Sequence, residues 1–213
     1  LEFPRRSGDA PTLVTGNRCE KAEALARSAD AKARIREIHQ RQKAVPDLLA
    51  LHEKRLVAEF PVRALAADRG VTIGLPRTLE FWDSLPFWSA LFRALGFRVR
   101  VSPSSSAALL EQGLPQVPSD TVCLPAKLVH GHVQALMKAD VQRIFFPLML
   151  KLPRRNRSSL ASWMCPVVQG YSEVVRHHDD PQRTRGIAWD NPAFSWDDLT
   201  VRDRQLARFL GER

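Results

Sequence analysis

The sequence has few cysteines and no long apolar run. Its three cysteines, Cys19, Cys123 and Cys165, are widely spaced and odd in number, which argues against a disulfide framework and leaves metal ligands, reduced thiols or inert buried thiols. No stretch approaches the roughly 20 apolar residues of a membrane helix, and no basic segment followed by an apolar one opens the chain. We therefore expect a cytoplasmic protein without a membrane partner.

Positive charge is in excess, with 32 Lys and Arg against 23 Asp and Glu and a formal net charge of +9. This excess suits nucleic acid, the phosphates of a nucleotide or of coenzyme A, or an acidic partner subunit, and charge alone does not choose among them. The charges up to about residue 60 are interspersed, which favours solvated helix faces over a nucleic-acid arm. Nucleic-acid binding is therefore not expected.

The composition changes near residue 66. Between residues 20 and 60 good helix formers dominate and Pro46 interrupts them, which predicts two helices, and residues 13–15 form a possible short strand before them. We expect residues 1–66 to form a mostly helical N-terminal arm. Because the chain begins at Leu1, we also expect it to be part of a longer polypeptide.

Beyond residue 66, short apolar runs alternate with helical patterns. Strands are predicted at 71–75, 97–101, 141–146 and 186–189, and helices at 80–95, 107–112, 126–139, around 171–175 and at 200–210. Strands that alternate with helices indicate a parallel sheet. The sequence therefore predicts an α/β fold, with a Rossmann-like, doubly wound and mainly parallel sheet over residues 67–213 and the helical arm before it.

Residues 119–132 contain several reactive side chains. Pro125 suits a first helical turn, so Cys123 directly precedes a helix, where free amides and the helix dipole favour a thiolate. Lys127 either lowers the pKa of this thiol, holds a phosphate, or is simply solvated. His130 and His132 are two residues apart on one helix, so they face different directions and do not easily share a metal. Each is a candidate for proton transfer, or else a capping or core histidine.

Two further groups extend this candidate site. Cys165 also precedes a proline and a predicted helix, and two thiols at the carboxyl ends of strands can meet over the sheet. Cys19 is the candidate third thiol. The basic run from Lys151 is either a solvated loop or a site for coenzyme A phosphates or an acidic partner. Its candidate binding residues are Arg154, Arg155 and Arg157.

Several motifs carry a family resemblance. They are Ile-Gly-Leu-Pro-Arg at 73–77, Pro-Phe-Trp at 86–88 with Leu-Gly-Phe at 95–97, Cys-Leu-Pro-Ala-Lys-Leu-Val-His-Gly-His at 123–132, and Cys-Pro-Val-Val-Gln-Gly-Tyr at 165–171. In this order they resemble the motifs of the acyl-CoA dehydratase activase-related proteins. The segment 15–20 also looks like that family's segment before the α/β domain, so the resemblance covers nearly the whole chain.

This resemblance implies a relationship to the iron–sulfur subunits of 2-hydroxyacyl-CoA dehydratases and benzoyl-CoA reductases. In that group, cysteines at strand ends hold a [4Fe–4S] cluster, and an ATP-hydrolysing activase delivers low-potential electrons. The implied role is electron transfer or acyl-CoA-directed redox chemistry, with an activase domain or a dehydratase-like subunit as partner. No Gly-rich phosphate loop occurs in this chain, so the ATPase itself would lie elsewhere.

One position departs from the family pattern. Many members have a cysteine directly after the strand-ending proline, where this sequence reads Phe-Pro-Leu148. A cluster normally takes three or four thiolates. With Cys123 and Cys165 as two ligands, the third would come from Cys19 or from another chain. The alternative is a non-catalytic scaffold that docks an activase or a dehydratase-like subunit.

Overall fold

The computed structural model describes residues 29–43, 45–58, 62–154, 156, 158 and 162–211. The chain divides into two units, with the boundary between Glu53 and Lys54. The described part of the first unit contains α2 (Ala29–Lys43) and most of α3 (Leu48–Leu56). The two helices predicted on either side of Pro46 are thus confirmed. The strand predicted at 13–15 lies outside the described residues, and an arm that ends at residue 66 stays a prediction.

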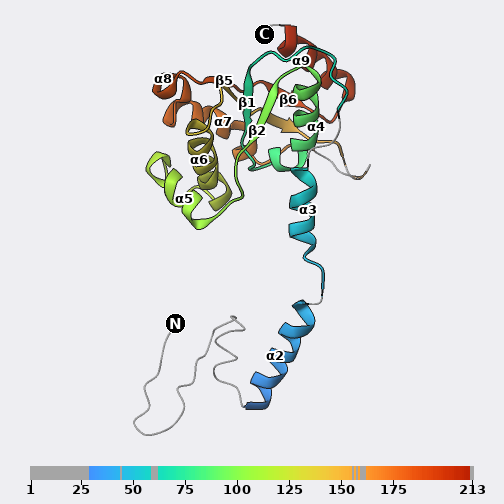
Figure 1. Ribbon diagram of the computed structural model, residues 1–213, viewed down its shortest axis with the longest axis vertical. Coiled ribbons are helices and arrows are strands. Elements are labelled where there is room, and N and C mark those ends of the chain that lie inside the picture. Colours follow the sequence, from blue (N-terminus) through green and yellow to red (C-terminus); the bar gives the residue numbers. More distant parts are fainter. Residues whose placement is uncertain are drawn as a thin grey trace. The chain divides into compact units, whose positions relative to one another are not determined.

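The second unit is built on a four-stranded sheet (Figure 1). Its strands are β1 (Thr72–Leu75), β2 (Arg98–Val101), β3 (Arg143–Phe145) and β5 (Ala188–Asp190). They lie in the order β2-β1-β3-β5, and each neighbouring pair is parallel. The chain first moves from β1 to β2 and then returns past β1 to β3 and β5. This order makes the sheet doubly wound, as predicted, with its switch point between β1 and β3.

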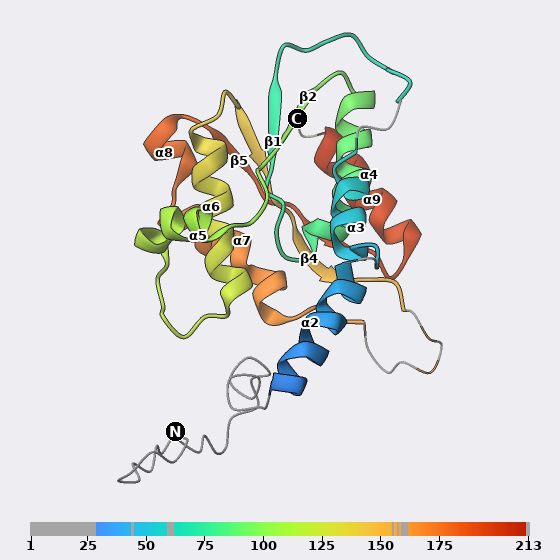
Figure 2. The ribbon, with the colours of Figure 1, turned by 60° about the horizontal axis from the view of Figure 1, so that its bottom comes forward.

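Helices cover both faces of this sheet (Figure 2). On one side lie α4 (Phe81–Ala94) and α9 (Leu199–Gly211). On the other side lie α5 (Ala107–Gly113), α6 (Leu124–Met137), α7 (Pro166–His178) and α8 (Pro181–Arg185). A short 3₁₀ turn, η1 (Leu114–Gln116), follows α5. The helices predicted from apolar spacing are all present, with ends shifted by a few residues.

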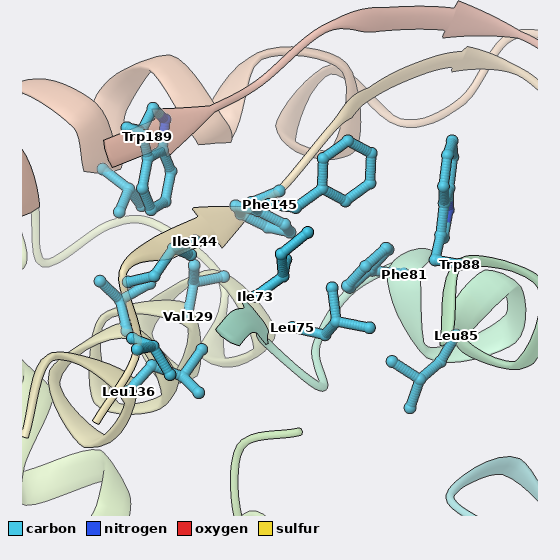
Figure 3. Close-up of a cluster of buried hydrophobic side chains, with 14 of the residues drawn as sticks. Ile73, Leu75, Phe81, Leu85, Trp88, Val129, Leu136, Ile144, Phe145 and Trp189 are labelled. Atoms are coloured by element: carbon cyan, nitrogen blue, oxygen red, sulfur yellow. The ribbon is translucent and has the colours of Figure 1, made fainter. Parts of the chain in front are cut away.

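The hydrophobic core fills the space between the sheet and its helices (Figure 3). On the α4 side, Trp88 is fully buried and its ring centroid lies 4.6 Å from that of Phe145. On the α6 side, the side chain of Leu136 packs over Gly74, where an added Cβ would lie 3.3 Å from it. Large side chains on one face of β1 and a glycine on the other therefore allow helices to pack on both faces.

A second, two-stranded sheet was not predicted. It consists of β4 (Leu148–Lys151) and β6 (Ala193–Ser195), which pair in parallel. The chain after β3 thus passes through Pro147 directly into another strand. Lys151 was predicted to begin an exposed loop; instead it ends β4, and its carbonyl accepts from the backbone N–H of Trp196 at 2.9 Å. The prediction was wrong at this residue because a three-residue partner strand gives no clear sequence pattern.

Candidate functional site at the carboxyl edge of the sheet

Cys123 and Cys165 occupy equivalent positions in the fold. Each directly precedes a helix, α6 or α7, whose first turn contains a proline, and neither side chain forms a capping hydrogen bond. Both residues are exposed. Because α6 leads into β3 and α7 leads into β5, both helices start at the carboxyl edge of the parallel sheet, where doubly wound folds bind their ligands.

His130 on α6 is fully buried and hydrogen-bonded through both ring nitrogens. Its Nδ1 lies 2.6 Å from Oδ2 of Asp179, and its Nε2 lies 3.0 Å from the Tyr171 hydroxyl. Gln134 donates its Nε2–H to the other carboxylate oxygen of Asp179 at 2.9 Å. When the neutral ring donates from Nδ1 to the Asp179 carboxylate, its Nε2 accepts from the Tyr171 hydroxyl. This network joins α6 to α7.

Tyr171 is also buried, with 6% of its surface exposed. Burial raises the pKa of Tyr171, and the negative charges of Asp179 and Cys123 raise it further. The phenol therefore stays protonated and acts as the donor to His130. Cys123 thus lies near enough to this network for a charge on its thiol to act on Tyr171.

His132 takes part in a separate network. Its Nδ1 lies 2.8 Å from Oγ of Ser102, and its Nε2 lies 3.0 Å from Oγ of Ser105. Burial, together with the positive charge of Arg77, lowers the pKa of His132 to about 4, so the ring is neutral near pH 7. The two histidines thus diverge as the sequence predicts, and both are core residues.

The loop after β1 holds a buried carboxyl group that sequence reasoning missed. Glu80 is 6% exposed; burial, with a smaller effect of Asp83, raises its pKa to about 7, while a hydrogen bond with Ser84 opposes the rise. Leu79 beside it has φ 53°, a conformation that non-glycine residues rarely adopt. Perturbed carboxyl groups and strained backbone concentrate at functional sites. This loop leaves β1 at the switch point of the sheet. Its position directly after the first predicted strand is the sequence signal by which Glu80 could have been identified.

The lysine and arginine residues predicted for the site lie in different parts of the structure. The Lys127 ammonium donates to the backbone carbonyl of Asp120 at 2.8 Å. Lys151 Nζ lies 3.4 Å from Oδ2 of Asp197 and 4.5 Å from the ring centroid of Trp163. Arg154 is exposed in the loop after β4. The remaining site candidates, Arg155, Arg157 and Cys19, lie outside the described residues.

The residues for an iron–sulfur cluster are present only in part. Within the ranges that the structure describes, no group of three or more His, Cys, Asp or Glu side chains is placed to hold a metal ion. Cys123 and Cys165 offer two thiols, the rings of His130 and His132 are bonded inside the protein, and Leu148 in β4 offers no ligand. The described residues therefore do not complete the ligand set of a [4Fe–4S] cluster.

The family model of the CoA enzyme activase uncharacterised domain (DUF2229) matches residues 72–212. The chain belongs to this family. The match runs from β1 through α9, so the family's domain contains both cysteines, both buried histidine networks and the loop of Glu80. It confirms the resemblance to the acyl-CoA dehydratase activase-related proteins.

Comparison with curated proteins and with solved structures gave no significant match. The family assignment therefore rests on the domain match. Within the described ranges, every helix is too short or too polar to cross a membrane.

Proposed function

We propose that this domain is an electron-transfer component of a CoA enzyme activase system, and that Cys123 and Cys165 ligate an iron–sulfur cluster. The supporting observation is the equivalent placement of the two exposed residues, each at the start of a helix on the carboxyl edge of one sheet. The first turn of a helix has amides without intrahelical partners, which can donate to anionic sulfur. The family match supports the activase context.

The other ligands of a [4Fe–4S] cluster would come from Cys19 or from a partner chain. A cluster held there would supply single electrons. The partner would be an ATP-dependent activase domain or a dehydratase-like subunit in the cytoplasm, and the chemistry would be directed at an acyl-CoA. Lys127 and the exposed Arg154 offer positive charge for coenzyme A phosphates or an acidic partner surface.

The buried network of His130, Tyr171 and Asp179 has a positioning role in this proposal. Asp179 and Tyr171 on the α7 side hold His130 of α6, so the two helices cannot slide past each other without breaking short hydrogen bonds. The spacing of the two cysteines depends on this link. Proton transfer by His130 or His132 would first require one of their present hydrogen bonds to open, and it stays a prediction.

Anaerobic reconstitution with iron and sulfide tests the cluster. We expect brown protein that contains iron and acid-labile sulfide, and we expect Cys123→Ser and Cys165→Ser each to remove the colour. Cys19→Ser distinguishes the two possible sources of the third ligand. Loss of the cluster in this variant would identify Cys19 as the ligand. Retention of the cluster would identify a partner chain as the source. Colourless protein without bound iron, both alone and with the activase present, would contradict the proposal.

A second candidate function is a scaffold that docks an activase or a dehydratase-like subunit without chemistry of its own. Leu148 favours it, because this residue, whose backbone pairs with Ala193 in the second sheet, stands where many relatives have a cysteine. The double variant Cys123→Ser/Cys165→Ser decides between the two functions. If the larger complex keeps its activity with this variant but loses it when the domain is deleted, the domain is a scaffold.

A further inference from the structure

The short loop between β1 and α4 buries a carboxyl group. It runs from Pro76 to Glu80 and connects Leu75, at the end of β1, with Phe81, at the start of α4 (Figure 3). Glu80 is 6% exposed, and its Oε2 has no hydrogen-bond partner among the residues that the structure describes. Glu80 is the N-cap residue of α4, yet its side chain makes no capping hydrogen bond. Ionisation of Glu80 in this loop would therefore leave a buried negative charge with one oxygen unsatisfied.

Burial dominates the electrostatics of Glu80. It raises the pKa of this carboxyl group from 4.5 to about 7, and the negative charge of Asp83 adds to the rise. A hydrogen bond from Ser84, which like Asp83 is on α4, opposes the rise. Arg77, the cation of the loop itself, acts on His132 of α6 instead. Glu80 is therefore protonated in the closed loop at mildly acidic pH and begins to ionise near neutral pH.

The backbone of this loop is strained and is tied to the end of β2. Leu79 has φ 53°, a left-handed conformation that a residue with a Cβ atom disfavours. Arg77 donates its backbone N–H to Oγ of Ser102 at 2.8 Å, and the same oxygen lies 2.8 Å from Nδ1 of His132. Both Ser102 and His132 are buried. Opening of the loop would relieve the strain at Leu79, break the bond from Arg77 and uncover the hydroxyl group of Ser102.

We propose that the loop from Pro76 to Glu80 is a pH-dependent lid, which opens when Glu80 loses its proton and uncovers Ser102 at the carboxyl edge of the sheet. In the open loop the carboxylate reaches water. Between pH 4.5 and 7 only the open state loses the proton, so each pH unit favours opening by about tenfold. The loop leaves β1 at the switch point, where doubly wound folds bind their ligands, so the lid makes this edge more accessible toward neutral pH. The proposal is independent of the cluster, because it uses neither cysteine.

Amide hydrogen exchange in the ¹⁵N-labelled 213-residue chain tests the lid, with rates corrected for the intrinsic pH dependence of exchange. The Arg77 N–H reports opening of the loop. The Phe146 N–H, which donates to the carbonyl of Asp190 at 2.8 Å, reports global unfolding. Between pH 4.5 and 7.5 the protection of the Arg77 N–H should fall about a hundredfold. That of Phe146 should change little, because global unfolding also exposes His132, whose opposite pKa shift offsets that of Glu80.

Glu80→Gln removes the titrating group and keeps the size of the side chain, so the protection of the Arg77 N–H should lose its steep fall with pH. Asp83→Asn is the matched control, because it neutralises an exposed carboxyl group in the first turn of α4, and it should keep the steep fall. A steep fall that survives Glu80→Gln would overturn the lid, because another group would then control the loop. Equal pH profiles of Arg77 and Phe146 in the parent chain would also overturn it, without any variant, because only global unfolding would then expose Arg77. Either result leaves the proposed cluster unaffected.

Discussion

Glu80 and His132 are buried ionisable residues whose pKa values shift in opposite directions. Burial raises that of Glu80 from 4.5 to about 7, and burial with the charge of Arg77 lowers that of His132 from 6.5 to about 4. Both shifts favour the neutral form. These two side chains therefore carry little charge in the folded state near pH 6.

These two residues predict an unusual dependence of stability on pH. Between pH 4.5 and 7 the folded state binds the extra proton at Glu80, so this contribution to the free energy of unfolding falls as pH rises. Between pH 4 and 6.5 the unfolded state binds the extra proton at His132, so that contribution rises with pH. Between pH 4.5 and 6.5, where both windows apply, the fall due to Glu80 and the rise due to His132 nearly cancel in the free energy of unfolding. Each pKa shift changes the free energy of unfolding by on the order of 3 kcal/mol across its pH window.

Single variants separate the two contributions. With Glu80→Gln, the free energy of unfolding from urea titrations should rise from pH 4.5 to 6.5, because only the effect of His132 remains. With His132→Gln it should fall over the same range. Glu111→Gln, which alters an exposed carboxyl group on α5, is the control and should keep the flat profile of the parent chain. A Glu80→Gln profile parallel to that of the parent would contradict a raised pKa at Glu80.

At the scale of elements, α5 and α6 approach each other at two glycines. A Cβ at Gly131 would lie 2.1 Å from the carbonyl oxygen of Leu109, and one at Gly113 would lie 2.2 Å from the backbone nitrogen of Gly131. No side chain fits at either place.

Two glycine variants test this packing. Gly131→Ala should lower the free energy of unfolding by about 2 kcal/mol or more, because the clash with backbone exceeds the gain in helix propensity. Gly170→Ala on α7 meets no atom within 4 Å, so it should raise stability by up to about 1 kcal/mol. Thermal and urea denaturation measure both. Equal stabilisation by the two variants would mean that α5 and α6 do not pack this closely.

At the scale of the molecule, the described core belongs entirely to the second unit. Its buried hydrophobic residues lie between Ile73 and Phe209, and α3 has no buried residue. Val57 just after α3 packs on this core, and the Leu65 N–H donates to the carbonyl of Ala94 at 2.7 Å. The segment directly before β1 therefore contributes to the stability of the α/β unit.

Two truncated chains test this division. A chain that starts at Leu48 should unfold within about 1 kcal/mol of the full chain, because the side chains before Leu48 whose burial the structure describes are all exposed. A chain that starts at residue 67, the predicted domain boundary, should be less stable, since it lacks Val57 and the bond from Leu65. Urea titrations followed by near-ultraviolet circular dichroism compare the two. Equal stability of both truncated chains would favour the predicted boundary over the observed contacts.

The sequence by itself determined the local elements of this protein. Apolar runs and helical spacing predict β1, β2, β5, α4 and α6, and Pro125 places Cys123 directly before a helix, because each of these features depends on residues close together in the chain. The same local argument makes His130 and His132 diverge.

Only the tertiary structure decided which side chains meet. His130 pairs with Asp179, 49 residues away, because the packing of α6 on α7 brings them together. The burial of Glu80 and the pairing of β4 with β6 likewise depend on segments that are distant in the chain. The sequence places Cys123 and Cys165 each before a helix, but the order of the strands and the packing of α6 on α7 bring both helix starts to one edge of the sheet.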